Sequence, residues 1–261
     1  MTKATSHLAS RPVALAHRGF SGGTSHALEN SMAAFRAAAE LGYRWVETDV
    51  HATVEGVLVA FHDTTLDRTS DGAGTIAHLP WEVVARARIA GHEPIPRLEE
   101  LLTQLPQVCV NIDVKSAGAV TPLIECIERC GAHDRVRIAS FSDARRRAVL
   151  AGLTRPVRSS PGQSRTIALW LAAHLPVLGS PLVARLAHGI DAVQIPERQG
   201  RLRVLTPRLL RALHGAGLDV HVWTVNERAD MERLLDLGVD GLITDRADVL
   251  KDVLVERGEW G

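Results

Sequence analysis

Side chains that can hold a metal ion or move a proton interrupt otherwise apolar segments of this sequence. Glu47 and Asp49 lie within one apolar segment, and Asp113 with Lys115 ends another. Ionisable groups are costly inside a protein unless they face solvent, a partner charge or a ligand. The full set is His17 and Arg18 after the first apolar segment, Glu47 and Asp49 in the second, His62, and Asp113 with Lys115. We therefore expect these residues to meet at one functional site.

Glu47, Asp49 and Asp113 form the acidic part of that predicted site. Like charges a few ångströms apart raise each other's pKa, so three carboxylates in one place favour a divalent cation between them. Hard oxygen ligands select calcium or magnesium, with manganese as a third option, over zinc. The alternative is a site without metal, in which Arg18 pairs with one carboxylate and Lys115 with another.

His17 and His62 are the natural pair for general acid/base catalysis, because histidine titrates near neutral pH. Gly19 follows His17 and Arg18 directly. A glycine at this position lets the backbone approach a ligand closely, as phosphate sites often need.

The segment from Val57 to His62 is expected to fold back on the preceding strand, because the connection between them is too short for a parallel crossover. A turn centred near Val54 and Glu55 would place His62 opposite Glu47, on the same face as Asp49. We expect this neighbour to make His62 the more basic of the two histidines.

Short apolar segments alternate with amphipathic stretches along the whole chain, which indicates βα units on a parallel sheet. The predicted strands are Val13–His17, Arg44–Val50, Val57–His62, Val108–Lys115, Arg135–Phe141, Pro156–Ser159, Ala192–Ile195, Asp219–Val225 and Gly241–Thr244. With the third one set aside as the hairpin partner, eight βα units remain. Eight such units in about 250 residues predict an α/β fold of the TIM-type (β/α)8 barrel.

The sequence predicts a single domain over residues 1–261, with an irregular insertion at about 63–96 after the second strand and its hairpin. Long loops at this place in a barrel usually shape or cover the active-site face.

Eight short motifs, in order along residues 13–248, resemble the glycerophosphodiester phosphodiesterase family. They are His17-Arg-Gly19, Glu29-Asn-Ser31, Glu47-x-Asp49, His62-Asp-x-x-Leu-x-Arg-Thr69, Ile95-Pro96 before Leu98-Glu99, Asp113-x-Lys115, Trp223-Thr-Val-Asn226 and Gly241-x-Ile-Thr-Asp245. Each motif is weak alone, but their order makes the resemblance specific.

The resemblance implies a metal-dependent hydrolase that cuts glycerophosphodiesters into glycerol 3-phosphate and an alcohol. It also implies the residue roles: His17 and His62 as the acid/base pair, Glu47, Asp49 and Asp113 as ligands of the divalent cation, Arg18 and Lys115 as phosphate contacts, and Trp223 as a wall for the substrate. Gln194, at the end of the sixth barrel strand, is a candidate substrate contact or a structural amide. The family usually has Glu where this chain has Asp113, which shortens the reach of that carboxylate by about 1.3 Å.

The composition agrees with a small-molecule substrate. The chain of 261 residues has 30 Lys and Arg against 30 Asp and Glu, so no net charge attracts nucleic acid. No secretory signal is apparent, so we expect a cytoplasmic protein. The apolar stretch Ile167–Ala187 contains polar residues and prolines, which favours two short helices over a stable membrane insertion.

Two other functions remain open from the sequence. One is a phosphodiesterase acting on lysophospholipids, whose acyl chain the Ile167–Ala187 stretch could receive; packing of this stretch against the barrel is the simpler interpretation. The other is a catalytically inactive barrel that only binds ligand, which the filled histidine and carboxylate positions disfavour.

Overall fold

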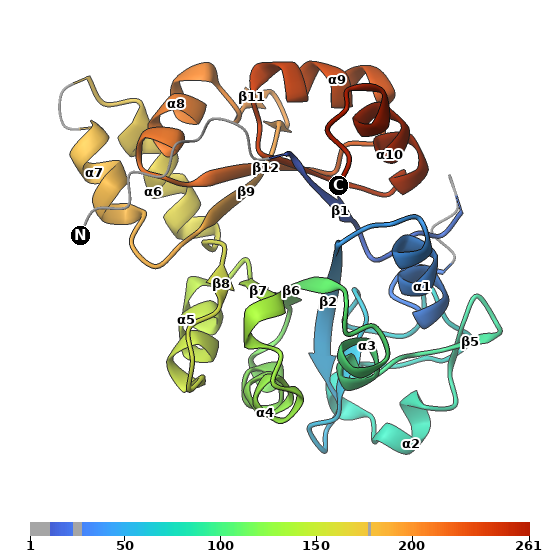
Figure 1. Ribbon diagram of the computed structural model, residues 1–261. Helices are drawn as coiled ribbons and strands as arrows, with labels where there is room; N and C mark the ends of the chain where they lie inside the picture. Colours follow the sequence, from blue (N-terminus) through green and yellow to red (C-terminus); the bar gives the residue numbers. More distant parts are fainter. Residues whose placement is uncertain (1–10, 23–27, 177–178) are drawn as a thin grey trace.

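Eight parallel strands form a nearly closed barrel, which confirms the predicted TIM-type architecture (Figure 1). The computed structural model describes residues 11–22, 28–176 and 179–261. The barrel strands are β1 (Val13–Ala16), β2 (Trp45–Ala52), β6 (Cys109–Val114), β7 (Val136–Ala139), β8 (Arg158–Ser159), β9 (Ala192–Pro196), β12 (Asp219–Trp223) and β13 (Gly241–Thr244). They are ordered β8-β7-β6-β2-β1-β13-β12-β9. At the seam between β8 and β9, Asp191 N donates to Ser159 O over 3.1 Å.

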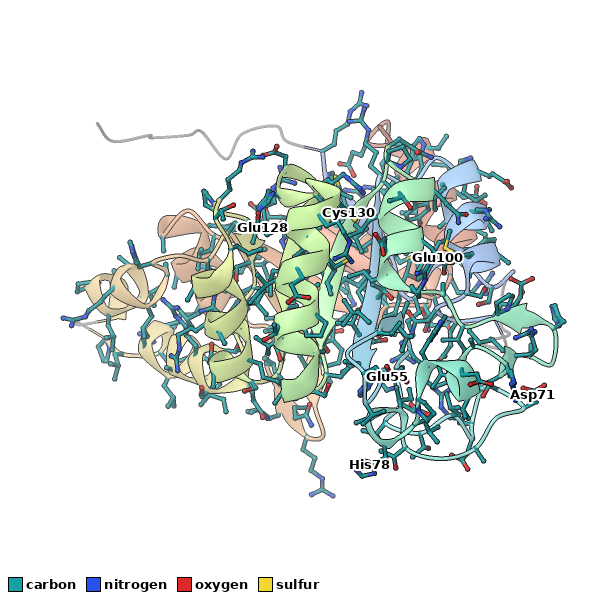
Figure 2. The ribbon with its side chains drawn as sticks, turned by 90° about the horizontal axis from the view of Figure 1, so that it is seen from below. Glu55, Asp71, His78, Glu100, Glu128 and Cys130 are labelled. Carbon is teal, nitrogen blue, oxygen red and sulfur yellow. The ribbon has the colours of Figure 1, made fainter. Side chains whose placement is uncertain are left out.

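Helices surround this barrel and cover the outward faces of its strands (Figures 1 and 2). They are α1 (Met32–Glu40), α3 (Leu98–Gln104), α4 (Val120–Cys130), α5 (Asp143–Gly152), α6 (Gln163–Ala173), α7 (Gly179–Leu186), α8 (Pro207–Gly215), α9 (Arg228–Leu237) and α10 (Ala247–Glu256), with short 3-10 turns at Ala117–Ala119 and His133–Arg135. Ser31, Ser142 and Thr206 cap α1, α5 and α8 by accepting a backbone N–H. The Ile167–Ala187 stretch forms two short helices, α6 and α7, as predicted, and no helix in the described residues is long and apolar enough to cross a membrane.

Side chains alternate along each barrel strand, and this alternation brings the site residues to one side of the wall. On β2, Val46 and Val50 are fully buried in the apolar layer under the helices, whereas Glu47 and Asp49 line the pocket inside the barrel. The register pairs Asp49 with Asp113 on β6. Both carboxylates therefore stand at the same level, near the carboxyl ends of their strands.

The hairpin partner β3 (Leu58–Ala60) pairs antiparallel with β2, but the predicted register is wrong by one residue. The observed pair is Val50 with Ala60, which would place His62 at the level of Thr48 and not of Glu47. The reason is the turn: Thr53 N donates to Val57 O over 3.0 Å, so the loop holds three residues instead of two. Gly56 provides the left-handed conformation, with φ +85°, that closes such a loop.

The segment after the hairpin forms a small lobe beside α1 and α3 (Figure 1). Its elements are a 3-10 turn at Ile76–His78, α2 (Trp81–Val84), β4 (Arg88–Ile89) and β5 (Glu93–Pro94). It has an apolar core of its own, formed by Val59, Phe61, Leu66, Ile76, Val84, Ala87, Ile89 and Ile95. Figure 2 shows Asp71 and His78 on the outer side of this lobe, away from the barrel. A second excursion, the hairpin of β10 (Arg198–Gln199) and β11 (Leu202–Arg203), follows β9.

Candidate active site

A single pocket of about 620 Å³ collects every residue that the sequence analysis assigns to chemistry. These residues are His17, Arg18, Glu47, Asp49, His62, Asp113, Lys115, Gln194 and Trp223. They come from the carboxyl ends of β1, β2, β6, β9 and β12 and from the chain after β3. The barrel therefore unites residues that are up to 206 positions apart in the chain (17 to 223).

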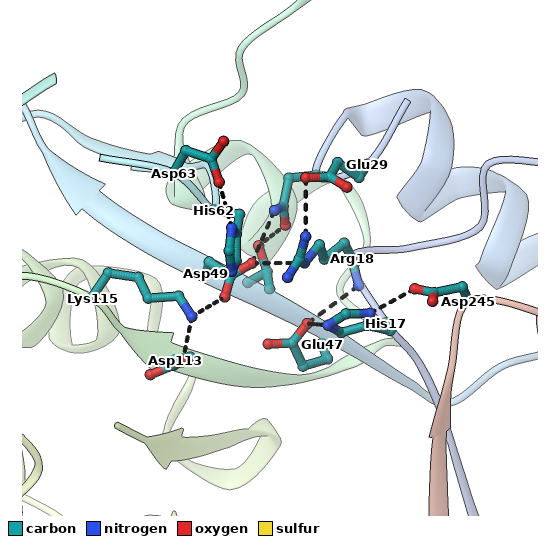
Figure 3. Close-up of polar contacts among 12 residues, drawn as sticks. His17, Arg18, Glu29, Glu47, Asp49, His62, Asp63, Asp113, Lys115 and Asp245 are labelled. Atoms are coloured by element: carbon teal, nitrogen blue, oxygen red, sulfur yellow. Dashed lines mark hydrogen bonds and ion pairs between the residues drawn. The ribbon is translucent and has the colours of Figure 1, made fainter. Parts of the chain in front are cut away.

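His17 follows β1 and is held by the carboxylate of Asp245, the residue directly after the last barrel strand, β13 (Figure 3). Its Nδ1 donates to Asp245 Oδ1 over 2.6 Å, and its Nε2 lies 3.8 Å from Glu47 Oε2. Asn226 Nδ2 donates to the other oxygen of Asp245 over 2.8 Å, which fixes that carboxylate. Burial lowers the pKa of His17, but the bond to Asp245 and the charge of Glu47 outweigh burial, so the pKa is raised.

His62 has a matching arrangement with a different carboxylate. Its Nδ1 donates to Asp63 Oδ1 over 2.6 Å, and Arg68 Nε donates to Asp63 Oδ2. The bond from Arg68, together with that from His62, lowers the pKa of Asp63 to about 2. His51 Nε2 donates to the His62 carbonyl over 3.1 Å and so fixes the backbone there.

The histidine beside Glu47 is His17, so the prediction that pairs Glu47 with His62 is wrong. The cause is the hairpin register described above. The basicity expected for His62 on that ground belongs to His17 instead, whose pKa the Glu47 charge helps to raise.

Glu47 and Asp49 are both buried, at 7% and 2% exposure, yet their pKa values are shifted in opposite directions. Burial, and then the charge of Asp49, raises the pKa of Glu47 to about 8. Burial also opposes ionisation of Asp49, but Lys115 and Arg18 outweigh it and hold the pKa of Asp49 below its ordinary value. Lys115 Nζ lies 2.8 Å from Asp49 Oδ1, and Arg18 Nε lies 3.3 Å from Asp49 Oδ2.

Asn30 links the chain after β1 to the side chain of Asp49 in β2. Its backbone N–H donates to Arg18 O over 2.9 Å, and its side-chain amide donates to Asp49 Oδ2 over 3.1 Å. Arg18 Nη1 donates to Glu29 Oε1 over 3.1 Å, so the guanidinium is held between Glu29 and Asp49 (Figure 3). Arg18 itself has φ +56°, an uncommon conformation that these contacts stabilise.

Gly19 has a packing role that the sequence analysis did not predict. A Cβ atom at this position would lie 2.7 Å from the backbone carbonyl carbon of Ala34 in α1. The glycine is therefore required for close packing of the chain on α1, at φ +83°.

The acidic residues fit a divalent cation in part. Lys115 Nζ donates to Asp113 Oδ2 over 2.7 Å, while Asp113 Oδ1 is buried without a hydrogen-bond partner. That oxygen and the buried Glu47 carboxylate are hard oxygen donors. Neither has a positively charged partner as close to it as Lys115 is to Asp49. Among the described residues, however, no three His, Cys, Asp or Glu side chains stand close enough to form a finished metal site.

Aromatic and amide side chains form the opposite wall of the pocket. The rings of Trp223 and Phe141 meet edge to face with centroids 6.1 Å apart, and Lys115 Nζ lies 5.7 Å from the Phe141 ring centre. Gln194 Nε2 donates to Asn111 Oδ1 over 3.0 Å, so this amide has a structural bond as well as a place in the pocket wall.

Sequence reasoning missed the residues that hold the others in place: Asp63, Arg68, Glu29, Asn30 and Asp245, and the wall residue Phe141. Most of them lie inside the motifs quoted in the sequence analysis, so those motifs were the signal that could have identified them. Phe141 lies at the end of the predicted fourth barrel strand, where wall residues are expected.

Comparison with known proteins gives a consistent result. The Glycerophosphoryl diester phosphodiesterase family model matches residues 17–249. The chain is 50% identical over 250 residues to a probable glycerophosphodiester phosphodiesterase 2 of Mycobacterium tuberculosis, covering 95% of this chain and 92% of that protein. It is 30% identical over 268 residues to a glycerophosphodiester phosphodiesterase of Caldanaerobacter subterraneus, covering 95% and 99%.

Solved structures share the fold. A phosphodiesterase of Oleispira antarctica, solved in complex with the product sn-glycerol-3-phosphate, superposes with a TM-score of 0.76 at 22% identity, covering 94% of this chain and 97% of that one. A putative glycerophosphoryl diester phosphodiesterase of Agrobacterium tumefaciens gives a TM-score of 0.76 at 25% identity, covering 95% and 99%.

Proposed function

Because the chain belongs to the glycerophosphoryl diester phosphodiesterase family, we propose that it hydrolyses glycerophosphodiesters to glycerol 3-phosphate and an alcohol. In this proposal His17 and His62 are the acid/base pair and the reaction depends on a divalent cation. The observation that carries it is the presence, in one pocket, of two imidazoles that each bond a carboxylate through Nδ1 at 2.6 Å. Each ring then has its Nε2 available for a proton transfer.

The two histidines have unequal surroundings, which suits opposite roles. The raised pKa of His17 favours its charged form, so His17 is suited to protonate the leaving alkoxide. His62 then accepts the proton of the attacking oxygen. Asp245 and Asp63 hold the rings in one orientation and one tautomer throughout.

Arg18 and Lys115 are suited to stabilise the negative charge that grows on the phosphoryl oxygens in the transition state. Both line the pocket, and Asp49 contacts both, which fixes their positions before substrate binds. Glu47, Asp49 and Asp113 would hold a divalent cation, and such an ion would neutralise further charge on the phosphate. Lys115, which bonds to Asp49 and Asp113, competes with the ion for these two ligands.

Turnover of glycerophosphoethanolamine by the purified protein tests this function. Release of glycerol 3-phosphate should stop after exhaustive chelation and return with calcium, magnesium or manganese. Full activity after chelation would remove the cation from the mechanism and support the site in which Arg18 and Lys115 alone neutralise the carboxylates. No turnover with any of these cations would instead support a barrel that only binds its ligand.

A further inference from the structure

Arg68 lies in the small lobe after β3 and reaches back to two carboxylates that hold residues of the active site. Its Nε donates to Asp63 Oδ2, and its Nη2 donates to Asp63 Oδ1 over 3.1 Å. The same Nη2 also donates to Glu29 Oε1. One guanidinium therefore binds both carboxylates at once, although Arg68 is not among the described residues that line the pocket.

Glu29 connects this guanidinium to Arg18. Its Oε1 atom accepts from Arg18 Nη1 over 3.1 Å as well as from Arg68, and its side chain is buried, with 6% exposed. Opposite charges attract each other more strongly where water is excluded. Because two guanidiniums share this one carboxylate oxygen, Glu29 neutralises Arg18 only in part. The rest of the Arg18 charge is available to a phosphate group.

Asp63 connects the same guanidinium to His62. Its Oδ1 atom accepts from His62 Nδ1 over 2.6 Å, and Arg68 bonds to both of its oxygens. Two bonds from one planar guanidinium fix the orientation of a carboxylate, which a single bond does not. The orientation of the Asp63 carboxylate in turn fixes the His62 ring. Figure 3 shows Asp63 and Glu29 on the same side of the His62 and Arg18 side chains.

Arg68 belongs to a turn that the core of the lobe holds in place. Leu66 is fully buried in that core, and its carbonyl oxygen accepts from Ser70 N over 3.2 Å and from Ser70 Oγ over 2.7 Å. Ser70 also pairs with Ile89 in an isolated β-bridge. Both ends of the turn are therefore anchored in the lobe, so the half-exposed Arg68 side chain starts from a fixed backbone.

We propose that Arg68 is a positioning residue of the reaction, which sets His62 and Arg18 relative to each other. It acts on His62 through Asp63 and on Arg18 through Glu29. This inference rests on the proposed function, in which His62 accepts the proton of the attacking oxygen while Arg18 contacts the phosphate. Both groups must be in place at the same moment, and a displacement of about 1 Å can cost roughly 10²-fold in rate. The lobe is then part of the machinery that prepares the site.

Replacing Arg68 by Ala should lower kcat/KM for glycerophosphoethanolamine by about 10- to 100-fold, the loss typical of residues that orient the groups of a reaction centre. Arg86→Ala is the matched control, because Arg86 lies in the same lobe and pairs with Glu82, both side chains being 76% exposed. It should leave kcat/KM unchanged. Melting curves of both variants verify that they fold.

Rescue experiments separate positioning from a role in the fold alone. Free guanidinium ion, at concentrations far below those that unfold the protein, should restore part of the activity of Arg68→Ala in a saturable manner. It should not stimulate Arg86→Ala or wild type. Arg68→Lys should have an activity between those of wild type and Arg68→Ala, because an ammonium group keeps the charge but lacks the planar fork.

The contact with Arg18 can be measured without turnover, by titration calorimetry with sn-glycerol 3-phosphate. Arg68→Ala should weaken binding by about fivefold, the size of one charged interaction near the surface, because Glu29 then neutralises Arg18 alone. Adding Glu29→Gln to Arg68→Ala should recover this binding, since the competing carboxylate is gone. The kcat of the double variant should stay low, because Asp63 still lacks its guanidinium.

Four results would overturn the inference. One is a kcat/KM in Arg68→Ala within about twofold of wild type, and another is an equal loss in Arg86→Ala. A third is the absence of rescue by guanidinium together with a lowered melting temperature of Arg68→Ala, which would assign Arg68 to the fold alone. The fourth is unchanged binding of sn-glycerol 3-phosphate in Arg68→Ala, which would remove the link to Arg18. Absence of turnover in wild type would instead overturn the proposed function, while calorimetry would still decide the link to Arg18.

Discussion

Asp49 and Asp113 occupy the same register position on the neighbouring strands β2 and β6, and the ammonium group of Lys115 bonds to both. Burial lowers the pKa of Lys115, but the two carboxylates outweigh burial and raise it above its ordinary value. The lysine is therefore charged and stands between the two side chains that we propose as cation ligands. This arrangement makes the lysine and the cation competitors.

Replacing Lys115 by Met removes that competitor. We expect tighter binding of the divalent cation, and hence a larger rise of the melting temperature on its addition, because two unpaired carboxylates then face each other. The kcat should fall at least tenfold, because a phosphate contact is lost. Calorimetric melts with and without cation measure the first effect. A smaller cation-induced shift in Lys115→Met than in wild type would contradict the competition.

The free Oδ1 atom of Asp113 predicts direct contact with the cation. Asp113→Asn should weaken cation affinity at least tenfold, because a neutral amide gives a hard cation far less charge. Titration calorimetry compares this variant with Asp134→Asn, a matched change at an exposed carboxylate. Equal affinities in wild type and Asp113→Asn would refute direct ligation.

Alanine at either His17 or His62 should lower kcat by at least about 10²-fold, because each change removes one proton-transfer group. His78→Ala provides the control, since His78 is exposed on the outer lobe. Steady-state kinetics with glycerophosphoethanolamine measure kcat for the three variants and for wild type. If His17→Ala kept most of its activity, the assignment of the acid would be wrong.

Asp245 positions His17, and its role should be visible in the pH profile. The bond to Asp245 raises the pKa of His17 against the effect of burial, so Asp245→Asn should lower that pKa. A general acid works only while protonated, and activity is lost as the pH rises through its pKa. The alkaline limb of the kcat profile should therefore move to lower pH in Asp245→Asn, beyond any fall in kcat. An unmoved limb would mean that Asp245 serves the fold alone.

His214 provides a stability prediction far from the site. Its Nε2 donates to Asp240 Oδ2 over 2.8 Å, and this bond raises the pKa of His214 more than burial lowers it. The folded state then holds the proton more tightly than the unfolded state, whose ordinary value is 6.5. The stabilisation is complete below that value and is lost as the pH rises through the raised pKa. His214→Gln should thus lower the melting temperature more at pH 5.5 than at pH 9, and an equal loss at both would contradict the ion pair.

The barrel could be predicted because its signal is local. Runs of apolar residues and the helices between them repeat along the chain, and all the predicted strands are present, one with its predicted bounds, Gly241–Thr244, and the others with shifted ends. The site followed from the same pattern, since parallel strands bring their carboxyl ends together. Glu47, Asp49, Asp113 and Lys115 reach one pocket for this reason.

Two features of the site, the hairpin register and the partner of His17, could not be predicted from the pattern of apolar segments. The hairpin register turned on whether Gly56 belongs to the loop, and one residue decided which histidine stands beside Glu47. The partner of His17 lies 228 positions further along the chain, at Asp245. Only the closure of β13 against β1 brings the two together, and no spacing rule links residues so far apart.

The seam between β8 and β9 has a consequence for how the active-site pocket is built. In the described chain its backbone contact is supplemented by Asp191, whose carboxylate accepts from the Ser159 backbone N–H and from Arg137. This carboxylate links β7, through Arg137, and β8, through Ser159, to the segment that leads into β9. Helix α6 follows β8 and the β10–β11 hairpin follows β9, so both start from the strands beside this seam, and both contribute residues to the active-site pocket. The pocket is therefore lined, on this side, by elements that start at the junction of the described barrel where the two neighbouring strands share no ladder.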